Sequence, residues 1–282
     1  MRLSVLYLCA ALRLASGQAP QPLGSLVDVG GYKVHLYCTG EGSPTVLVVG
    51  GFSMDWALVQ PEVAKFTRVC TYDVAGTAWS DAAPVGTCKQ RATEIHKLLA
   101  GVPEPYVFTG LSVGAQVSRF YAREYPSEVS GMVLVNHAFT PKVARRTSGA
   151  EPANGNSPPV LIFQTPITVT VEDTSVFKKL PARIQELHRW AAARHPQVDH
   201  SIASDDCAAQ LEGTSLGALP LAVISTGNEA PGYKELQKEL LTLSTQSQHF
   251  KAERSFHSVE IDQPEVVIEA IRRVVNQVRT AH

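Results

Sequence analysis

The sequence predicts an α/β protein built on a mostly parallel, doubly wound sheet of eight strands. From about residue 25 onward, short runs rich in β-branched residues alternate with stretches of helix length. The run Val46 to Val49 is apolar at every position, as expected of a strand buried on both faces of a parallel sheet. Helix-length spacers separate most of the later strands, which favours right-handed crossovers between parallel neighbours.

The expected strands follow from these apolar runs. The first two flank Gly30-Gly31, a two-residue hairpin signal, so we expect them to form an antiparallel hairpin. The eight strands are expected at 25–29, 33–38, 45–49, 68–72, 106–109, 131–135, 221–225 and 249–253.

Three helices are predicted on the core. One covers 89–99, and another starts after Gly114 and runs to about Glu124, before a Tyr-Pro pair. The last is expected to begin near Asp262, with this residue as its cap and a proline in its first turn. Its apolar stripe consists of Val267, Ile271, Val274 and Val278.

The middle of the chain interrupts the alternation. Residues 139–171 are rich in Pro, Thr, Ser and Gly, and a helical stretch follows with apolar residues at steps of three and four. We interpret 139–212 as an inserted helical lid, so that the core consists of residues 20–138 and 213–282. The apolar positions of the lid helix are Phe177, Leu180, Ile184, Leu187 and Ala191.

Composition narrows the classes of partner. The chain has 282 residues, and its 25 Lys and Arg against 26 Asp and Glu give a formal net charge of −1. Because phosphate neutralisation needs an excess of basic residues, nucleic acid is not expected as the main partner. After the N-terminal stretch, no segment approaches the roughly 20 apolar residues of a membrane span.

The N-terminus has the pattern of a secretory signal peptide. Arg2 precedes the apolar stretch Leu3 to Leu12, and small residues follow near an expected cleavage point between Gly17 and Ala19. We therefore expect residues 1–19 to be removed, Cys9 with them, and the protein to be secreted or periplasmic.

The residues Gly110-Leu111-Ser112-Val113-Gly114 carry the chemistry. The motif follows an expected strand and opens an expected helix, the setting in which a sharp turn exposes a serine hydroxyl. Small neighbours are required because the turn is tight, and the serine is held in a strained conformation. Ser112 is the predicted nucleophile.

A serine nucleophile needs a histidine base. His257 stands between the last strand and the final helix, where the chain order serine, acid, histidine would place it. The other histidines considered for this role lie in the lid, at a strand start, at the C-terminus, or far from the end of the sheet that bears the motif: His188, His195, His200, His249, His282, His35 and His96.

Two backbone N–H groups are expected to bind the oxyanion. One belongs to Val113, the residue after the nucleophile, and the other to Phe52, in the turn that follows the third strand. Gly50 and Gly51 before Phe52 allow close approach of the backbone to a substrate.

These features resemble the α/β-hydrolase fold over nearly all of the mature sequence, and in particular a lid-bearing group of serine hydrolases. The resemblance implies a triad of serine, acid and histidine, esterase-like chemistry on a small-molecule ester-like substrate, and no cofactor. It also leaves open C–C bond hydrolysis, lyase or perhydrolase chemistry with the same triad. Ser112 disfavours the epoxide hydrolases and haloalkane dehalogenases of this fold, which use Asp at that position. The segments that carry the resemblance are Leu36-Tyr37-Cys38-Thr39-Gly40, Met54-Asp55-Trp56, Thr71-Tyr72-Asp73 to Ser80-Asp81, and Gly110 to Gly114.

The triad acid departs from the pattern of the fold. Asn136 stands after the sixth strand, where Asp is one usual choice, and Glu229 follows the seventh strand, near the other usual place. We favour Glu229 as the residue that orients His257 and keep Asn136 as the alternative. Because the usual triad acid is not evident, a catalytically impaired pseudo-hydrolase that only binds a ligand remains an alternative. No metal site is expected, because the Asp, His and Cys residues between 199 and 207 match no familiar ligand spacing.

The fold also implies how the four remaining cysteines pair. Cys38 ends the second strand and Cys70 opens the fourth, and these strands are antiparallel neighbours in the α/β-hydrolase fold. A disulfide is therefore expected between them. A second expected bond joins Cys88 to Cys207 and would attach the lid to the core.

Overall fold

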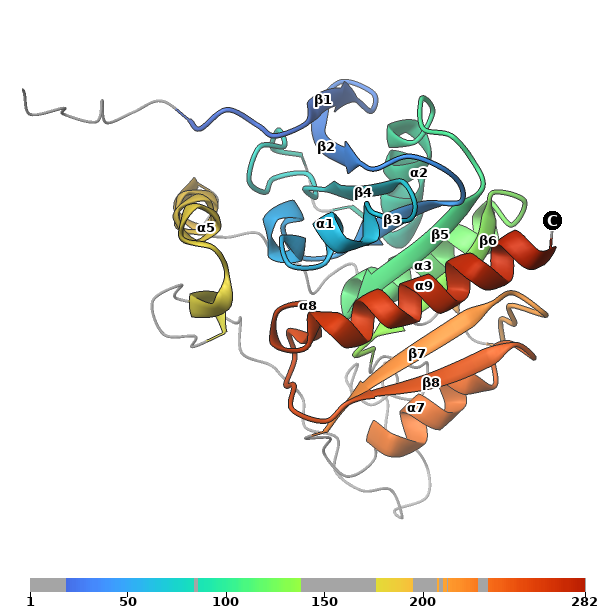
Figure 1. Cartoon of the computed structure of the whole chain (residues 1–282). Helices are drawn as coiled ribbons and strands as arrows, with labels where there is room; N and C mark the ends of the chain where they lie inside the picture. The colour runs from blue at the N-terminus through green and yellow to red at the C-terminus, as the bar shows by residue number, and fades with distance from the viewer. Residues whose placement is uncertain are drawn as a thin grey trace, which may run out of the picture.

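The computed structural model describes residues 19–83, 86–137, 176–194, 207, 210–211, 213–227 and 233–281. Its centre is one eight-stranded sheet in the order β1-β2-β4-β3-β5-β6-β7-β8 (Figure 1). The strands are β1 Ser25–Asp28, β2 Lys33–Thr39, β3 Thr45–Val49, β4 Val69–Tyr72, β5 Tyr106–Leu111, β6 Val129–Val135, β7 Leu221–Thr226 and β8 Ser247–Ala252. All eight predicted strands are confirmed, and none of their ends differs from the prediction by more than two residues.

The pairing of the strands is antiparallel at one edge and parallel elsewhere. β1 pairs antiparallel with β2, and β2 pairs antiparallel with β4, while the remaining neighbours are parallel. Gly30 and Gly31 connect β1 to β2 with φ angles of 116° and 105°, which glycine adopts without steric cost. The predicted hairpin and the mostly parallel sheet are therefore both confirmed.

Two hydrophobic cores lie on the two faces of the sheet. Successive residues of a strand point to opposite faces, so Leu47 and Val49 enter one core while Val46 and Val48 enter the other. The helices α2 Cys88–Leu98, α3 Val113–Glu124 and α7 Tyr233–Leu241 cover the first core. The second core is covered by α1 Gln60–Val63, α8 Val259–Asp262 and α9 Pro264–Ala281, and α9 runs along the front of the sheet in Figure 1.

The C-terminal helix differs from its prediction at its first turn. Asp262 ends the short helix α8 rather than capping the final one, and α9 begins at Pro264. The apolar stripe was predicted correctly, since Val267, Ile271 and Val274 are fully buried and Val278 nearly so.

Part of the predicted lid is described. It contains the short turn η2 Phe177–Lys179 and the helix α5 Ala182–Arg194. Leu187 and Ala191 of α5 are buried against Met54 and Trp79 of the core. The other residues of the predicted lid, 139–175 and most of 195–212, lie outside the described residues, as do residues 1–18 with the predicted signal peptide.

Both predicted disulfides are present. Cys38 and Cys70 lie opposite each other in the register of β2 and β4, with their Cα atoms 4.0 Å apart. Cys88, the first residue of α2, is bonded to Cys207 with a Cα separation of 5.2 Å.

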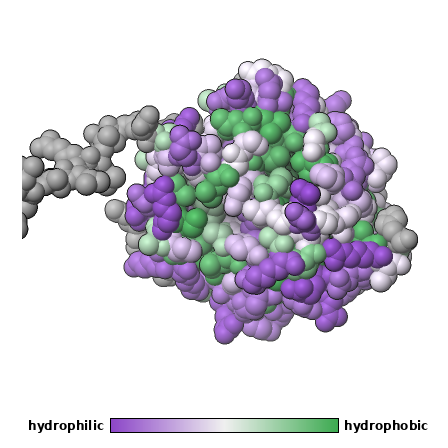
Figure 2. Space-filling view, turned by 45° about the horizontal axis from the view of Figure 1, so that its top comes forward, coloured by the Kyte–Doolittle hydropathy of each residue, from purple (hydrophilic) through white to green (hydrophobic). Residues whose placement is uncertain are grey.

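The surface is mixed in polarity. Figure 2 shows apolar residues gathered over the upper part of one face and hydrophilic residues along its lower part. Among the described residues, the large apolar side chains that are clearly exposed are Leu23, Leu26 and Phe256. No helix in the described ranges is long and apolar enough to cross a membrane.

Candidate active site

Ser112 occupies the turn between β5 and α3 in a strained backbone conformation. Its φ and ψ angles are 53° and −116°, which a residue with a Cβ adopts only when its surroundings force it. The neighbouring glycines explain how the turn closes. A Cβ on Gly110 would lie 2.5 Å from the Cα of Ala115, and one on Gly114 would overlap the carbonyl oxygen of Val49. The motif therefore forms the sharp strand-to-helix turn predicted for a nucleophile.

The end of β6 links this serine to His257. The backbone N–H of Ser112 donates to the carbonyl oxygen of Val135 over 3.0 Å. The next residue, Asn136, places its side-chain nitrogen 3.0 Å from Nδ1 of His257. The predicted nucleophile and the predicted base thus both contact the segment that ends β6.

His257 lies in the loop between β8 and α8. Desolvation by the surrounding protein lowers its pKa below the ordinary histidine value, which favours the neutral imidazole. A neutral imidazole is the form that can accept a proton from a serine hydroxyl.

Among the described residues, Asn136 provides the side chain that contacts the ring of His257. Its φ angle of 42° lies in the left-handed region, which asparagine tolerates better than most residues. Besides the contact with Nδ1, its side-chain nitrogen lies 3.4 Å from the carbonyl oxygen of His257. In this orientation the amide donates to Nδ1, so a neutral His257 carries its proton on Nε2.

The orientation of that amide decides which tautomer His257 adopts. If the amide is turned over, its oxygen accepts a proton from Nδ1, and Nε2 becomes free to act as a base. The favoured acid of the sequence analysis, Glu229, lies outside the described residues.

The turn after β3 carries the second expected oxyanion donor. Gly50 and Gly51 have φ angles of 105° and 73°, so the turn depends on glycine. The N–H of Phe52 donates to Oδ2 of Asp55 over 2.8 Å, and the N–H of Ser53 donates to Oδ1 of Asp73 over 2.7 Å. In this arrangement the Phe52 N–H already has a carboxylate as its acceptor.

Val113 is the first residue of α3, a helix of twelve residues. The first N–H groups of a helix have no partner within it, and the helix dipole makes this end partially positive. The Val113 N–H therefore lies where a developing negative charge on an oxygen next to Ser112 would be stabilised.

A group of buried ionisable side chains lies beside Phe52 and was not predicted from the sequence. Nε2 of His188, on α5, lies 2.8 Å from Oδ1 of Asp55, and Glu260 on α8 is buried close enough for the Asp55 charge to raise its pKa further. Burial is the main cause, and the pKa of Glu260 lies well above the usual carboxyl range. In the sequence, Asp55 lies in a segment that resembles the α/β-hydrolase fold, and His188 lies in the predicted lid. The presence of polar residues within the apolar segments around 55 and 260 was the available signal.

His137 was missed as well. It is fully buried directly after Asn136, and its ring contacts the carbonyl oxygen of Ser112. Its place next to a candidate triad residue, at the carboxyl end of a strand, was the signal in the sequence.

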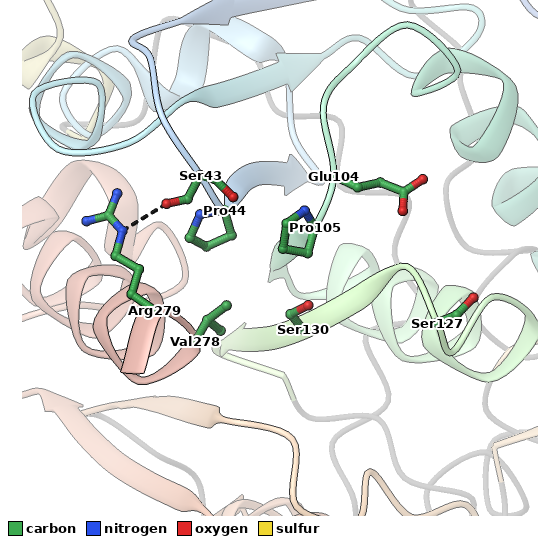
Figure 3. Close-up of a pocket in the computed structure, with 8 residues that line it drawn as sticks. All are labelled: Ser43, Pro44, Glu104, Pro105, Ser127, Ser130, Val278 and Arg279. Carbon is green, nitrogen blue, oxygen red and sulfur yellow. Dashed lines mark hydrogen bonds between the residues drawn. The ribbon is translucent and has the colours of Figure 1, made fainter. Parts of the chain in front are cut away.

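A hollow with a volume of about 490 Å³ lies at the end of the sheet opposite to Ser112. Figure 3 shows Pro44 and Pro105, which precede β3 and β5, side by side in this hollow. Arg279 donates a hydrogen bond to the carbonyl oxygen of Ser43. The described residues that line it include no histidine or cysteine, so they offer no serine–histidine pair. Within the described ranges, no group of three or more His, Cys, Asp and Glu side chains is arranged to hold a metal ion.

The sheet order, the strained serine turn and the helices on both faces define the class of the protein: it has the α/β-hydrolase fold, as the sequence predicted. No protein-family model matches the chain. It is 24% identical over 247 residues to YqjL, an uncharacterised protein of Bacillus subtilis, covering 82% of this chain and 83% of the relative. It is 25% identical over 271 residues to an AB hydrolase superfamily protein of Gibberella zeae, covering 79% of this chain and 83% of that protein.

Solved structures that resemble this protein are described as hydrolases of several different kinds. A protein from Acinetobacter baumannii described as a lipase superposes with a TM-score of 0.68 at 16% identity, covering 92% of each chain. An epoxide hydrolase from Vigna radiata gives a TM-score of 0.66 at 14% identity, over 90% of this chain and 97% of that one. A thermophilic esterase from Thermogutta terrifontis gives 0.62 at 22% identity, over 88% and 94%. These similarities establish the fold. The type of reaction has to be inferred from the residues of the site.

Proposed function

We propose that the protein is a serine hydrolase that cleaves a carboxylic ester through an acyl-enzyme on Ser112. The observation that carries the proposal is the strained conformation of Ser112 between β5 and α3, with glycines at 110 and 114 where side chains would collide. Such strain at a serine in a sharp turn between a strand and a helix is typical of a catalytic nucleophile. The esterase and the described lipase among the structural neighbours agree with this chemistry.

In the proposed reaction, Ser112 Oγ attacks the ester carbonyl carbon while His257 accepts the hydroxyl proton. The negative charge that forms on the carbonyl oxygen is stabilised by the N–H groups of Val113 and Phe52. Collapse of this intermediate breaks the bond to the alcohol, which leaves with the proton from His257. A water molecule then attacks the acyl-enzyme while His257 accepts its proton. The bond to Ser112 Oγ breaks, His257 returns the proton to Ser112, and the carboxylic acid is released.

The substrate that we propose is a small or medium apolar ester. Phe256 is 67% exposed and directly precedes His257, which places an apolar ring next to the base. The described part of the lid adds Leu187 and Ala191, which pack against Met54 beside Phe52. These apolar groups favour an uncharged acyl or alcohol group over a charged one.

We also propose that the protein is exported. Two disulfides join Cys38 to Cys70 and Cys88 to Cys207, and such bonds persist mainly in oxidising compartments. N-terminal sequencing of the mature protein, isolated from the organism that makes it, tests the expected cleavage between residues 17 and 19. A mature protein that begins at Met1 would contradict it.

Labelling with a fluorophosphonate probe tests the proposed nucleophile. The wild-type protein is expected to label and to hydrolyse short p-nitrophenyl esters, while Ser112→Ala does neither. Ser118→Ala is a matched control. Ser118 is a buried serine on α3, the helix that follows Ser112, and its hydroxyl donates to the Gly114 carbonyl. A wild-type protein that neither labels nor hydrolyses any ester would refute the proposal.

A second candidate is a pseudo-hydrolase that binds a ligand without turning it over. The observation that favours it is the side-chain nitrogen of Asn136 at Nδ1 of His257, because this contact leaves the proton of a neutral ring on Nε2. In a serine-protease triad, replacing the Asp by Asn gives the wrong tautomer and lowers turnover by about 10⁴. Retained ligand binding without fluorophosphonate labelling would support this candidate.

A further inference from the structure

His137 is a buried histidine whose ring contacts the backbone of the proposed nucleophile. It follows Asn136 at the end of β6, and its Nδ1 lies 3.2 Å from the carbonyl oxygen of Ser112. A carbonyl oxygen only accepts hydrogen bonds, so this contact requires the ring proton to be on Nδ1.

The other side of the ring favours the same tautomer. Nη1 of Arg119, on α3, lies 3.5 Å from Nε2 of His137, and a guanidinium is a donor only. Burial, together with the positive charge of Arg119, lowers the pKa of His137 to about 3. The ring is therefore neutral near pH 7, with its one proton facing Ser112 and its lone pair facing Arg119.

The backbone of His137 is fixed too. Its carbonyl oxygen accepts a hydrogen bond of 2.7 Å from the side-chain amide of Gln237, on α7. Arg119 is also buried, and desolvation lowers its pKa to about 10, so it keeps its charge at neutral pH. Arg119 on α3 thus contacts the ring, while Gln237 on α7 holds the backbone of His137 beside the serine turn.

The carbonyl group of Ser112 belongs to the same peptide unit as the N–H of Val113. A trans peptide unit is planar, and its C=O and N–H point in opposite directions. A hydrogen bond that fixes the Ser112 carbonyl therefore also fixes the direction of the Val113 N–H. The same carbonyl oxygen also accepts the N–H of Ala115 over 3.0 Å. His137 and the first turn of α3 therefore hold this plane together against the strained ψ of −116° at Ser112.

We infer that His137 is a positioning residue, held by Arg119, that orients the Val113 N–H toward the oxyanion. The inference deepens the proposed function and rests on it, since it assigns how one of the two oxyanion donors is aimed. His137 does not touch the substrate and exchanges no proton during the reaction.

The kinetic test compares His137→Leu with His137→Asn. Leucine removes the ring donor, whereas the asparagine amide can place an N–H close to the position of Nδ1. Because loss of one oxyanion donor costs about 10²–10³ in kcat, we expect His137→Leu to lower kcat by about 10- to 100-fold with KM within about threefold. His137→Asn is expected to restore at least half of that loss on a logarithmic scale.

The controls separate positioning from a general loss of structure. His96→Leu removes an exposed histidine on α2 that contacts Glu128 and stacks on Tyr125, and it should keep the wild-type kcat. The pH midpoint of the acid limb of kcat/KM should not move in the His137 variants, because His257 is the base. Equal kcat values for the Leu variant and the wild type, or equal losses in the Leu and Asn variants, would overturn the inference.

A measurement on the wild-type protein tests the inference without any activity. Nitrogen-15 NMR of the histidine side chains should show His137 as a neutral Nδ1–H tautomer that does not titrate between pH 4.5 and 8. The Val113 amide should shift or exchange faster in His137→Leu than in His137→Asn. If the wild-type enzyme proves inert, the proposed function fails. In that case the NMR result alone decides the role of His137, and an Nε2–H tautomer would overturn it.

Discussion

The side-chain nitrogen of Asn136 lies 3.0 Å from Nδ1 of His257, where a triad carboxylate would stabilise the imidazolium. An amide can orient the ring but carries no charge to stabilise its protonated form. The activity of the protein should therefore depend on this one position more than on any other residue that contacts His257.

We expect Asn136→Asp to raise kcat for p-nitrophenyl acetate by about 10- to 1,000-fold. The reverse change in a serine-protease triad costs about 10⁴, and a carboxylate here would both select the Nδ1–H tautomer and stabilise the imidazolium. Steady-state kinetics of the purified variant measure the effect.

The matched control for this prediction is Glu229→Gln. If Asn136 is the orienter, this variant keeps the wild-type kcat, and Asn136→Asp gains activity in its presence as well. A large loss in Glu229→Gln with no gain in Asn136→Asp would instead assign the acid to Glu229.

The pH dependence of kcat/KM should show an acid limb with its midpoint below 6.5, the ordinary pKa of histidine. Desolvation lowers the pKa of His257, so the neutral base persists as the pH falls through 6.5 and activity is lost only further down. In Asn136→Asp the new carboxylate favours the charged ring, and the midpoint should move upward. A wild-type midpoint above 6.5 would indicate that a carboxylate already faces His257.

Asp55 is expected to restrain the second oxyanion donor. Its Oδ2 accepts the Phe52 N–H over 2.8 Å, and a hydrogen bond to a charged acceptor is roughly twice as strong as one to a neutral acceptor. Asp55→Asn keeps an acceptor but removes the negative charge, so the N–H is released more easily to the oxyanion. We expect kcat/KM to rise by about three- to tenfold.

Lys179→Met is the control for that variant. It removes the ion pair of 2.7 Å between Lys179 and Asp262, another contact of segment 176–194 with the core, and leaves Phe52 and Asp55 unchanged. Its kcat/KM should stay at the wild-type value. A fall in kcat/KM for Asp55→Asn alone would mean that the carboxylate supports the turn after β3 rather than restraining it.

The two disulfides are expected to contribute unequally to stability. Cys38–Cys70 spans 32 residues and Cys88–Cys207 spans 119, and a longer loop loses more entropy in the unfolded chain when it is closed. Each pair of Cys→Ser changes should lower the free energy of unfolding by roughly 2–5 kcal/mol, with the larger loss for Cys88 and Cys207. Urea unfolding of both double variants measures this, and equal midpoints to the wild type would contradict it.

The sheet and the serine turn could be predicted because each has a local signal, and the cysteine pairs followed from the expected fold. A run such as Val46 to Val49 is apolar at every position only where both faces of a strand are buried, and glycines at 110 and 114 are required by the turn around Ser112. The register of β2 and β4 then brings Cys38 and Cys70 together without further information.

The electrostatics around the site could not be predicted in this way. Asp55 and Glu260 are ordinary charged residues in the sequence, and only the packing of α5 and α8 beside the turn after β3 buries them together. Asp262 was wrongly expected to cap the last helix, because a four-residue helix that precedes it has no periodicity to reveal it. Whether Asn136 or another residue contacts His257 depends on how two strand ends lie in space, which neither local sequence contains.

Glu260 should make the stability of the protein depend on pH. It is 2% exposed, burial and the charge of Asp55 raise its pKa, and its Oε2 has no hydrogen-bond partner among the described residues. A carboxyl whose pKa is higher in the folded than in the unfolded state binds more protons when folded, so stability falls as the pH rises from the ordinary carboxyl range through the raised value.

Glu260→Gln removes this dependence of stability on pH. It should match the wild type near pH 4 and exceed it by on the order of 1–3 kcal/mol at pH 8. Thermal or urea unfolding across pH 4–8 measures the difference, with Glu269→Gln, in an exposed pair with Arg273, as a control that should change stability by less than about 0.5 kcal/mol at any pH. Parallel stability curves for Glu260→Gln and the wild type would show that the Glu260 carboxyl titrates alike in the folded and unfolded states.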